Sequence, residues 1–191
     1  MIAALILAAG AGSRFGGPKQ IAELRGRPLI ELAIEAVAVV PAIERIVVVL
    51  GAEAELIRNR ADLSGVEVVV APDWEEGMAA SLRAGVAAVG DAEAVLITLA
   101  DQPLITPHVV AAVLDRMDSP APAARATYDG RPGHPVLIKR ELFEDVSVLS
   151  GDAGARDLLD LVGVATVECG HLASDHDVDT RANLEAIGGE V

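Results

Sequence analysis

The N-terminal stretch from Leu5 to Lys19 constrains the fold most, because it joins a short apolar run directly to a cluster of glycines. An apolar run of this length, closed by glycines, is typical of a buried strand that enters a tight loop. Glycines allow backbone N–H groups to approach an anion closely, and Arg14 and Lys19 add two cationic side chains to the same loop. The stretch therefore predicts a phosphate-binding loop after the first strand.

Two better-known glycine loops do not fit this stretch. A Rossmann fingerprint requires G-x-G-x-x-G running into a helix, whereas here the third glycine comes one place late and Gly17-Pro18 interrupts any helix. A Walker loop requires Ser or Thr after its lysine, and Lys19 is followed by Gln20. A glycine turn without a ligand is the alternative interpretation, and the two cationic side chains disfavour it.

Apolar runs rich in β-branched residues alternate with segments of helical period along the whole chain. Continuous apolar strands separated by helices predict a single-domain α/β fold of three layers, with an open, mostly parallel sheet. Helices are expected from Pro28 through Val37, from Met78 through Val86, over Val109–Met117 and over Ala153–Leu161. The expected strands are Ala3–Ala8, Arg45–Leu50, Val66–Ala71, Ala94–Ala100, Arg125–Tyr128, His134–Ile138 and Val164–Cys169.

Length and charge limit the organisation and the partners. With 191 residues, 52% of them hydrophobic, the chain suits one core and one domain. A linker-like stretch at 119–124 divides an expected nucleotide-binding half, about 1–118, from an acceptor-binding half, about 124–191. The net charge of −14 argues against nucleic acid and against an anionic membrane. The single cysteine, Cys169, fits a reducing compartment, so we expect a cytoplasmic protein.

Acidic side chains are expected at the same rim of the sheet as the loop. Asp101 follows the apolar strand Ala94–Ala100, and ligands of such sheets bind beyond the carboxyl ends of the strands. Carboxylate oxygens suit Mg²⁺, which also binds substrate phosphates. Asp177 and Asp179 form a second acidic element, and in extended backbone both would project to one side. A solvated acidic loop is the alternative, and which of these two aspartates would bind a metal stays open.

Two further segments carry candidate side chains. Gly77 opens a helix on which Ser81 and Arg83 could face a ligand, although an ordinary amphipathic helix fits the spacing equally. Glycine and proline residues predict a turn before a strand that starts near His134, whose imidazole could bind an anionic or pterin-like acceptor. A histidine at a strand start is more often structural. The histidines lack metal-ligand spacing, which excludes a zinc site.

Several of these segments resemble the MobA-like nucleotidyltransferases. LAAGAGSRFGGPK is similar to the family motif L-A-A-G-x-G-x-R-M-G-x-x-K, with Phe15 in place of Met, and LADQP resembles the metal-binding motif around Asp101. DHDVDT resembles the family's D-I-D-T-P, with Arg181 where proline is usual. GHPVL and the following GDAGAR resemble the acceptor side of the molybdenum cofactor cytidylyltransferase branch. This resemblance implies the Rossmann-like fold of nucleotide-diphospho-sugar transferases.

The resemblance also implies residue roles. Arg14, Lys19 and Asp101 would be catalytic, and Asp101 would bind the metal together with Asp177 or Asp179. The implied cofactor is Mg²⁺, with Mn²⁺ as an alternative. Acceptor binding would fall to Gly133, His134 and Pro135. The implied nucleotide-binding residues are Leu7, Ala8, Ala9, Gly10, Gly12, Ser13, Arg14, Lys19, Ser81 and Asp101.

The activity implied by the resemblance is nucleotidyl transfer from CTP to molybdopterin, the organic part of the molybdenum cofactor, with release of pyrophosphate. A pyrimidine is favoured because the loop carries Ala-Ala-Gly, whereas the guanylyl-transferring branch carries Ala-Gly-Gly. A molybdoenzyme that receives the product is a further expected partner. The alternatives are a nucleotidyltransferase for a sugar phosphate or another phosphorylated metabolite, a non-catalytic carrier of the molybdenum cofactor, and a redox enzyme, for which the chain lacks a nicotinamide fingerprint.

Overall fold

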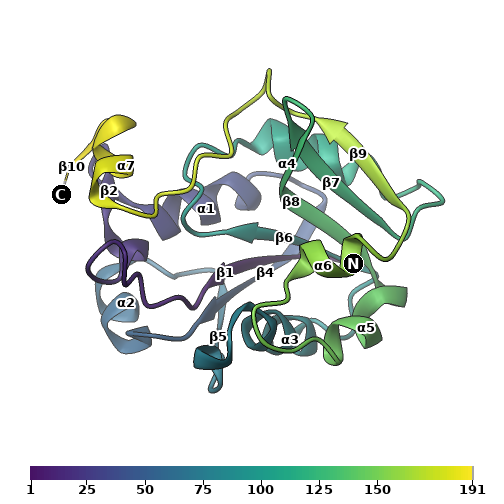
Figure 1. Ribbon diagram of the computed structural model, residues 1–191, viewed down its shortest axis with the longest axis horizontal. Coiled ribbons are helices and arrows are strands. Elements are labelled where there is room, and N and C mark those ends of the chain that lie inside the picture. The colour runs from purple at the N-terminus through teal and green to yellow at the C-terminus, as the bar shows by residue number, and fades with distance from the viewer. Residues whose placement is uncertain (191) are drawn as a thin grey trace.

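A seven-stranded sheet runs through the computed structural model, which describes residues 1–190, and helices cover both of its faces (Figure 1). Neighbouring strands are parallel except for the two pairs made by β8, which is antiparallel to β6 and to β7. The three-layer, mostly parallel α/β fold is therefore confirmed. The strand order is β5 (Glu67–Val70), β4 (Ile43–Leu50), β1 (Ile2–Ala8), β6 (Ala94–Leu99), β8 (Arg131–Lys139), β7 (Ala123–Tyr128) and β9 (Val164–Glu168).

The central strands are apolar on both sides because both faces of the sheet are covered. One face packs against α1 (Leu29–Ala38), α2 (Ala54–Arg60) and α4 (Pro107–Leu114), whose apolar side chains join one core cluster. The other face packs against α3 (Met78–Ala88), α5 (Phe143–Ser147) and α6 (Ala155–Leu159). In Figure 1, α3 and α5 lie side by side below the sheet. We call this second side the α3 face.

Helix α3 approaches strand β1 closely at one position. Gly85 lies in the middle of α3, and a Cβ atom there would overlap the Cδ1 atom of Leu5, which is fully buried in β1. Glycine lowers helix stability relative to alanine, so its presence here reflects packing and not helix propensity.

A second, three-stranded sheet lies beside the loop that follows β1. It consists of β2 (Glu23–Leu24), β3 (Arg27–Pro28) and β10 (Gly189–Glu190), and it is flanked by α7 (Arg181–Ala186). Its small core joins Phe15 to Leu24, Leu29, Val178 and Leu184. Because β10 pairs with β2, the end of the described chain lies next to the glycine loop, as the left side of Figure 1 shows.

The expected strands and helices correspond to observed elements, with shifts at their ends. The N-cap and the first residue of α4 are Thr106 and Pro107. Helix α6 is shorter than expected, and its N-cap is Gly154, whose N–H donates to the Asp157 carboxylate. Helices α2, α5 and α7, the small sheet, and the 3-10 turns η1 (Lys19–Ile21), η2 (Trp74–Glu76) and η3 (Arg140–Leu142) were not expected.

Strand β8 begins earlier than predicted. It starts at Arg131, so Gly133 lies inside the strand and not in a turn before it, and His134 is the fourth residue of the strand and not its first. The turn is formed by Asp129 and Gly130, both in the left-handed region with φ of 52° and 74°. Two left-handed residues of this type form the tight hairpin turn that matches strand twist, which allows β7 and β8 to pair directly.

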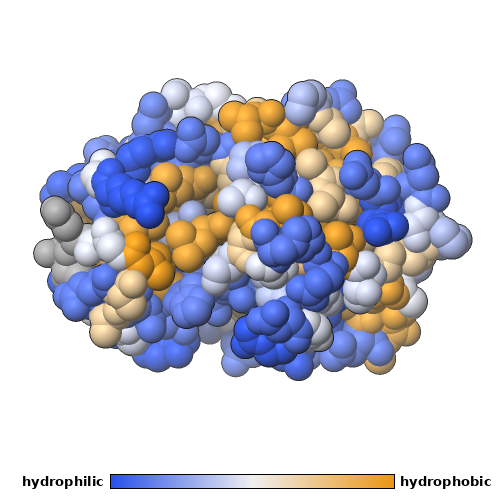
Figure 2. Space-filling view, turned by 90° about the horizontal axis from the view of Figure 1, so that it is seen from above, coloured by the Kyte–Doolittle hydropathy of each residue, from blue (hydrophilic) through white to orange (hydrophobic). Residues whose placement is uncertain are grey.

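The surface mixes polar and apolar residues. Figure 2, seen from above, shows hydrophobic groups separated by hydrophilic ones, with blue residues dominating the outline. Among residues 1–190, none of the helices has the length and apolar composition needed to cross a membrane.

Candidate active site

The glycine loop folds back on one carbonyl at the carboxyl end of β1. The Gly12 oxygen accepts hydrogen bonds from the backbone nitrogens of Phe15, Gly16 and Gly17 at 2.9, 2.9 and 3.3 Å. Gly12 has a φ of 63°, and a Cβ there would overlap the Gly17 carbonyl oxygen. Glycine is therefore required at position 12, and the loop forms a compact turn beside the sheet.

A buried glutamine fixes the start of this loop. The Nε2 atom of Gln20 donates to the carbonyl oxygens of Ala8 and Gly10 at 2.7 and 2.8 Å, and the side chain is only 3% exposed. Sequence reasoning used Gln20 only to exclude a Walker loop and missed this role. The only feature of the sequence that pointed to Gln20 was its position directly after Lys19, at the end of the predicted phosphate-binding loop.

Lys19 brings the loop and both acidic segments together. Its Nζ lies 2.6 Å from Asp101 Oδ2 and 2.9 Å from Asp179 Oδ1, while Nη1 of Arg14 lies 3.1 Å from Asp179 Oδ2. Burial alone would lower the pKa of Lys19, but the two carboxylates outweigh it and raise the pKa above its ordinary value. The ammonium is therefore charged at neutral pH, and two carboxylates and two cations share one rim of the sheet.

Asp177 and Asp179 have different partners. Asp177 accepts a hydrogen bond from Gln102 Nε2 at 2.8 Å, and burial raises the pKa of its carboxyl group. The N–H of Val178, between the two aspartates, donates to the main-chain oxygen of Asp101 at 2.8 Å. This segment is irregular backbone and not a strand, so the two-residue strand period does not apply to it, although Asp101 and Asp179 lie close enough to Asp177 to raise its pKa further. Asp179 is the one that faces Asp101 across Lys19.

The donor set fits a divalent cation that is shared with a substrate. Carboxylate oxygens of Asp101 and Asp179 both lie within 2.9 Å of one point, the Lys19 ammonium, and such hard oxygens suit Mg²⁺ or Mn²⁺. Within the described residues, no group of three or more His, Cys, Asp or Glu side chains is arranged to hold a metal ion. A cation here would thus take one or two protein carboxylates and complete its shell with phosphate oxygens and water.

A cavity of about 360 Å³ opens between the loop and the start of α3. Seven of the ten predicted nucleotide-binding residues line it. Gly12, Ser13 and Arg14 do not, and Ser13 and Arg14 are exposed. Sequence reasoning did not identify Trp74, Met78 or Asp152 as lining residues. The full lining is Leu7, Ala8, Ala9, Gly10, Lys19, Gln20, Trp74, Glu75, Gly77, Met78, Ser81, Leu99, Ala100, Asp101 and Asp152.

Helix α3 presents Ser81 to this cavity and directs Arg83 elsewhere. Ser81 is 6% exposed and is one of the lining residues. Arg83 donates to the Leu149 carbonyl oxygen at 2.6 Å and pairs with Glu76 at 3.1 Å. Arg83 therefore has a structural role in joining α3 to the segment that follows α5, and the prediction that it could face the ligand is wrong.

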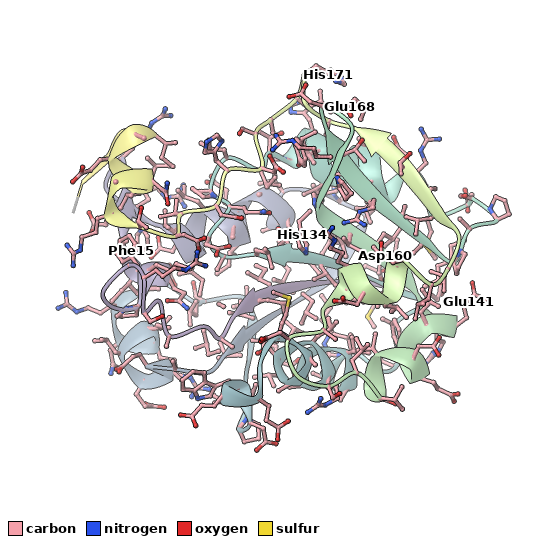
Figure 3. All side chains as sticks on the ribbon, viewed as in Figure 1. Phe15, His134, Glu141, Asp160, Glu168 and His171 are labelled. Carbon is pink, nitrogen blue, oxygen red and sulfur yellow. The ribbon has the colours of Figure 1, made fainter. Side chains whose placement is uncertain are left out.

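The predicted acceptor residues lie on the central part of the sheet, in β8. Figure 3 labels His134, which is half-buried and lies over the middle of the sheet. Burial lowers the pKa of its imidazole to about 4, so the ring is neutral at pH 7. Its main-chain oxygen accepts a hydrogen bond from the Tyr128 hydroxyl at 2.7 Å. Gly133, His134 and Pro135 do not line the 360 Å³ cavity.

Comparison with known proteins agrees with this geometry. The model of the MobA-like NTP transferase domain matches residues 4–169. Nicotine blue oxidoreductase of Paenarthrobacter nicotinovorans is 38% identical over 189 residues, which cover 94% of this chain and 92% of that protein.

Two further curated relatives are nucleotidyltransferases. The 2-C-methyl-D-erythritol 4-phosphate cytidylyltransferase of Rhodococcus opacus is 32% identical, with 86% of this chain and 69% of the relative covered. The molybdenum cofactor guanylyltransferase of Shewanella pealeana is 32% identical, with 81% of this chain and 76% of the relative covered.

Solved structures share the whole architecture. The Mycobacterium sp. strain JC1 homologue of Rv0371c superposes with a TM-score of 0.86 at 29% identity, covering 97% of this chain and 96% of that one. A manganese complex of Rv0371c from Mycobacterium tuberculosis superposes with a TM-score of 0.81 at 25% identity, covering 97% of both chains.

Proposed function

The chain belongs to the family of MobA-like NTP transferases, and from this membership we propose that it is a cytidylyltransferase for the molybdenum cofactor. In the proposed reaction a phosphate oxygen of molybdopterin attacks the α-phosphorus of CTP, and pyrophosphate leaves. The main support is the cluster of Lys19, Arg14, Asp101 and Asp179 beside the 360 Å³ cavity. It combines phosphate-binding cations with metal-binding carboxylates at the carboxyl end of a parallel sheet.

The proposed mechanism depends on positioning and on charge stabilisation. The acceptor is itself a phosphate monoester, so its attacking oxygen needs no strong general base. Lys19 and Arg14 would bind the triphosphate and stabilise the negative charge that moves onto pyrophosphate. Backbone groups from Leu7 to Gly10 would contact the base, and Ser81 would line the nucleotide side. A divalent ion held by Asp101 and Asp179 would supply Lewis-acid stabilisation of the phosphates.

The choice of CTP is supported by Ala9. This residue lines the cavity and is 6% exposed, and its carbonyl oxygen accepts the Ala52 N–H at 3.0 Å, which fixes its place. A Cβ at this position reduces the room for a purine relative to glycine. A site that pairs with the polar edge of one base leaves its own groups unmatched against another base.

The test is incubation with each nucleoside triphosphate, Mg²⁺ or Mn²⁺, and molybdenum cofactor. Nucleotide incorporation and pyrophosphate release are both followed, and CTP competes directly with GTP. We expect CTP to be preferred, and Ala9→Gly to weaken that preference. Equal or greater use of GTP by the unaltered protein would contradict the cytidylyl assignment and leave nucleotidyl transfer intact.

A second candidate acceptor is a polyol or sugar phosphate. It is favoured by the 32% identical relative that is a 2-C-methyl-D-erythritol 4-phosphate cytidylyltransferase. The same incorporation assay with 2-C-methyl-D-erythritol 4-phosphate in place of molybdenum cofactor separates the two acceptors. Faster transfer to this acceptor would replace the molybdenum cofactor assignment.

An oxidoreductase is the third candidate, favoured by the relative named nicotine blue oxidoreductase. Loss of nicotinamide absorbance in the presence of nicotine blue measures this activity directly. A non-catalytic carrier is separated by Asp101→Ala, because a carrier would retain cofactor delivery without this carboxylate, whereas a transferase would lose its product.

A further inference from the structure

Arg125 is a buried cation that the proposed mechanism does not use. It lies in β7, is 7% exposed, and its Nε atom has no hydrogen-bond partner in the part of the chain described. Buried arginines normally satisfy the donors of their planar fork, because an unmet donor in a desolvated position is costly. Arg45 and Arg83 are only partly buried, at 29% and 28% exposure of their side chains, and even so their donors are bonded to Glu67 and to the Leu149 carbonyl oxygen.

The charges around Arg125 do not compensate its burial. Burial lowers the pKa of the guanidinium, Asp160 acts in the opposite sense, and Arg156 adds repulsion. Arg125 also lowers the pKa of His134, which shows that the guanidinium and the imidazole lie close enough to interact electrostatically. Arg125 and His134 therefore lie near each other, and Asp160 is the one carboxylate that offsets the charge of Arg125.

Strand register places this pair on the side of the sheet that holds the nucleotide cavity. Val136 of β8 pairs with Ile97 of β6 on one side and with Arg125 of β7 on the other, and both apolar residues belong to the α3-face core. Extending the antiparallel register by two residues sets His134 opposite Leu99, which lines the cavity two positions before Asp101. His134 lies two residues from Val136 on β8 and is therefore diagonal to Arg125, next to a register shift between Arg125 and Thr127. Leu99, His134 and Arg125 thus follow one another across the strands, away from the proposed metal-binding carboxylates.

Figure 3 labels two residues of this region, His134 and Asp160. His134 lies over the middle of the sheet, and Asp160, at the end of α6, lies on the neighbouring part of the molecule. Helix α6 contributes Leu158 and Leu159 to the core cluster that contains Val136, and it carries Arg156, with Asp160 directly after it, close enough to Arg125 to affect its pKa. A charged ligand group that reaches this place would be largely removed from water.

We propose that Arg125 and His134 form a subsite for the phosphate monoester of the acceptor. A guanidinium fork matches two phosphate oxygens, and a neutral imidazole can donate one N–H to a third. The inference rests on the proposed function for the identity of the ligand as the acceptor. The subsite would hold the attacking phosphate beyond Leu99, with the triphosphate on Lys19 and Arg14 on the other side.

Inorganic phosphate is the probe, and the imidazole NMR resonances at constant pH are the readout. The protein has four histidines, and His134→Gln assigns the resonance of interest. In the parent we expect a saturable shift of the His134 resonance at phosphate concentrations up to about 100 mM. In Arg125→Met the dissociation constant for phosphate at this resonance should rise at least about tenfold. Arg58→Met, on the exposed surface of α2, is the matched control and should leave the titration unchanged.

Stability separates a ligand site from a structural role. Replacing an unpartnered buried cation by an apolar side chain of similar length should keep or raise the melting temperature without phosphate. If Arg125→Met prevents folding, Arg125→Lys is used, which retains the charge and loses the fork, and the same tenfold criterion applies. An unchanged phosphate titration in the folded variant, or no phosphate response of His134 in the parent, would overturn the proposal.

Calorimetric titration with CTP separates this subsite from the proposed function. Arg125→Met should bind CTP as the parent does, because the nucleotide site uses the glycine loop and not β7. Phosphate binding at His134 without CTP binding would keep the subsite and remove the cytidylyltransferase assignment. CTP binding without phosphate binding at His134 would keep the cytidylyltransferase assignment and remove the subsite.

Discussion

Lys19 lies where the proposed triphosphate-binding cations meet the two carboxylates that are proposed to bind a metal ion. Its contacts with Asp101 and Asp179, at 2.6 and 2.9 Å, hold these carboxylates side by side without an extended acidic cluster. If a nucleotide and a metal ion bind to these groups as proposed, Lys19 has to exchange its carboxylate contacts for phosphate oxygens. Substrate binding would therefore replace the Lys19 ion pairs with Asp101 and Asp179 by ion pairs with phosphate.

Asp101→Ala should remove transfer activity while leaving the fold intact. The carboxylate lies at the rim of the sheet and not in its apolar core, so its loss leaves core packing unchanged. Steady-state turnover should fall by much more than about tenfold, which corresponds to roughly 1.4 kcal/mol of barrier. Asp115→Ala, an exposed aspartate after α4, is the control. A folded Asp101 variant that stays within tenfold of the parent would remove the metal role.

Arg14→Ala and Lys19→Ala should both lower kcat/KM, but they should differ in stability. The Arg14 side chain is 75% exposed, so its removal should leave the melting temperature nearly unchanged. The Lys19 side chain is 14% exposed, and its removal leaves two neighbouring carboxylates without their common counter-ion, so the melting temperature should fall. Kinetics and thermal unfolding together test both statements, and unchanged kcat/KM in both variants would contradict the loop assignment.

The sequence predicted which residues form the site where a motif defines them, but it did not predict which side chains they contact. Sequence placed Lys19, Arg14 and Asp101 at one rim, and the structure brings all three to the same cluster. It could not choose between Asp177 and Asp179, because that choice depends on irregular backbone which turns one towards Gln102 and the other towards Lys19. Arg125 was expected only as a strand residue, because its burial depends on tertiary packing, which the sequence does not show.

At the level of elements, the packing of α3 on β1 depends on Gly85. Gly85→Ala should destabilise the protein even though alanine favours helix by about 1 kcal/mol. The new Cβ would overlap the fully buried Leu5, and overpacking of this kind costs about 1–3 kcal/mol. Chemical denaturation measures the change, and Gly163→Ala, where a Cβ has open space, is the control. A gain in stability at position 85 would show that the two elements can move apart freely.

The hairpin of β7 and β8 should carry a pH-dependent part of the stability. The Glu168 carboxylate accepts hydrogen bonds from the backbone nitrogens of Asp129, Gly130 and Gly170 and from the Thr127 hydroxyl, at 2.9 to 3.1 Å. These bonds lower its pKa from 4.5 to about 2. A carboxyl group whose pKa is lower in the folded than in the unfolded state stabilises the fold at pH values above its unfolded pKa. This stabilisation is lost as the pH falls from 4.5 towards 2.

Glu168→Gln should therefore unfold more easily than the parent at pH 7 and by a smaller margin at pH 3. Urea midpoints at the two pH values measure the difference. Glu144→Gln, an exposed glutamate in α5, serves as the control. A constant gap between parent and variant at both pH values would exclude the carboxylate as the origin.

Element types were predictable where the pattern is long, and element ends were not. Strands such as β1 and β4 are continuous apolar runs that need only burial on both faces. The two-residue strands β2, β3 and β10 have no period to recognise and form through pairing across the chain. The start of β8 was misplaced because the Asp129-Gly130 turn, and not the later glycine and proline, sets the hairpin.

For the whole molecule, the two halves inferred from the sequence share one sheet. β6 of the first half pairs with β8 of the second, and the α3-face core contains side chains from both. Calorimetry should therefore give one unfolding transition, with equal calorimetric and van't Hoff enthalpies. Two resolved transitions would show that residues 1–118 and 124–191 are separate folding units.

The antiparallel attachment of β8 has an evolutionary consequence. A hairpin joined to β6 along one edge can change its length and its side chains while β1 and β6 keep their pairing and the proposed nucleotide site. Under the proposed function, the part that handles the triphosphate can then stay the same while the part that selects the acceptor changes. Relatives named for molybdenum cofactor and for a methylerythritol phosphate, both at 32% identity, are the diversity that such an arrangement permits.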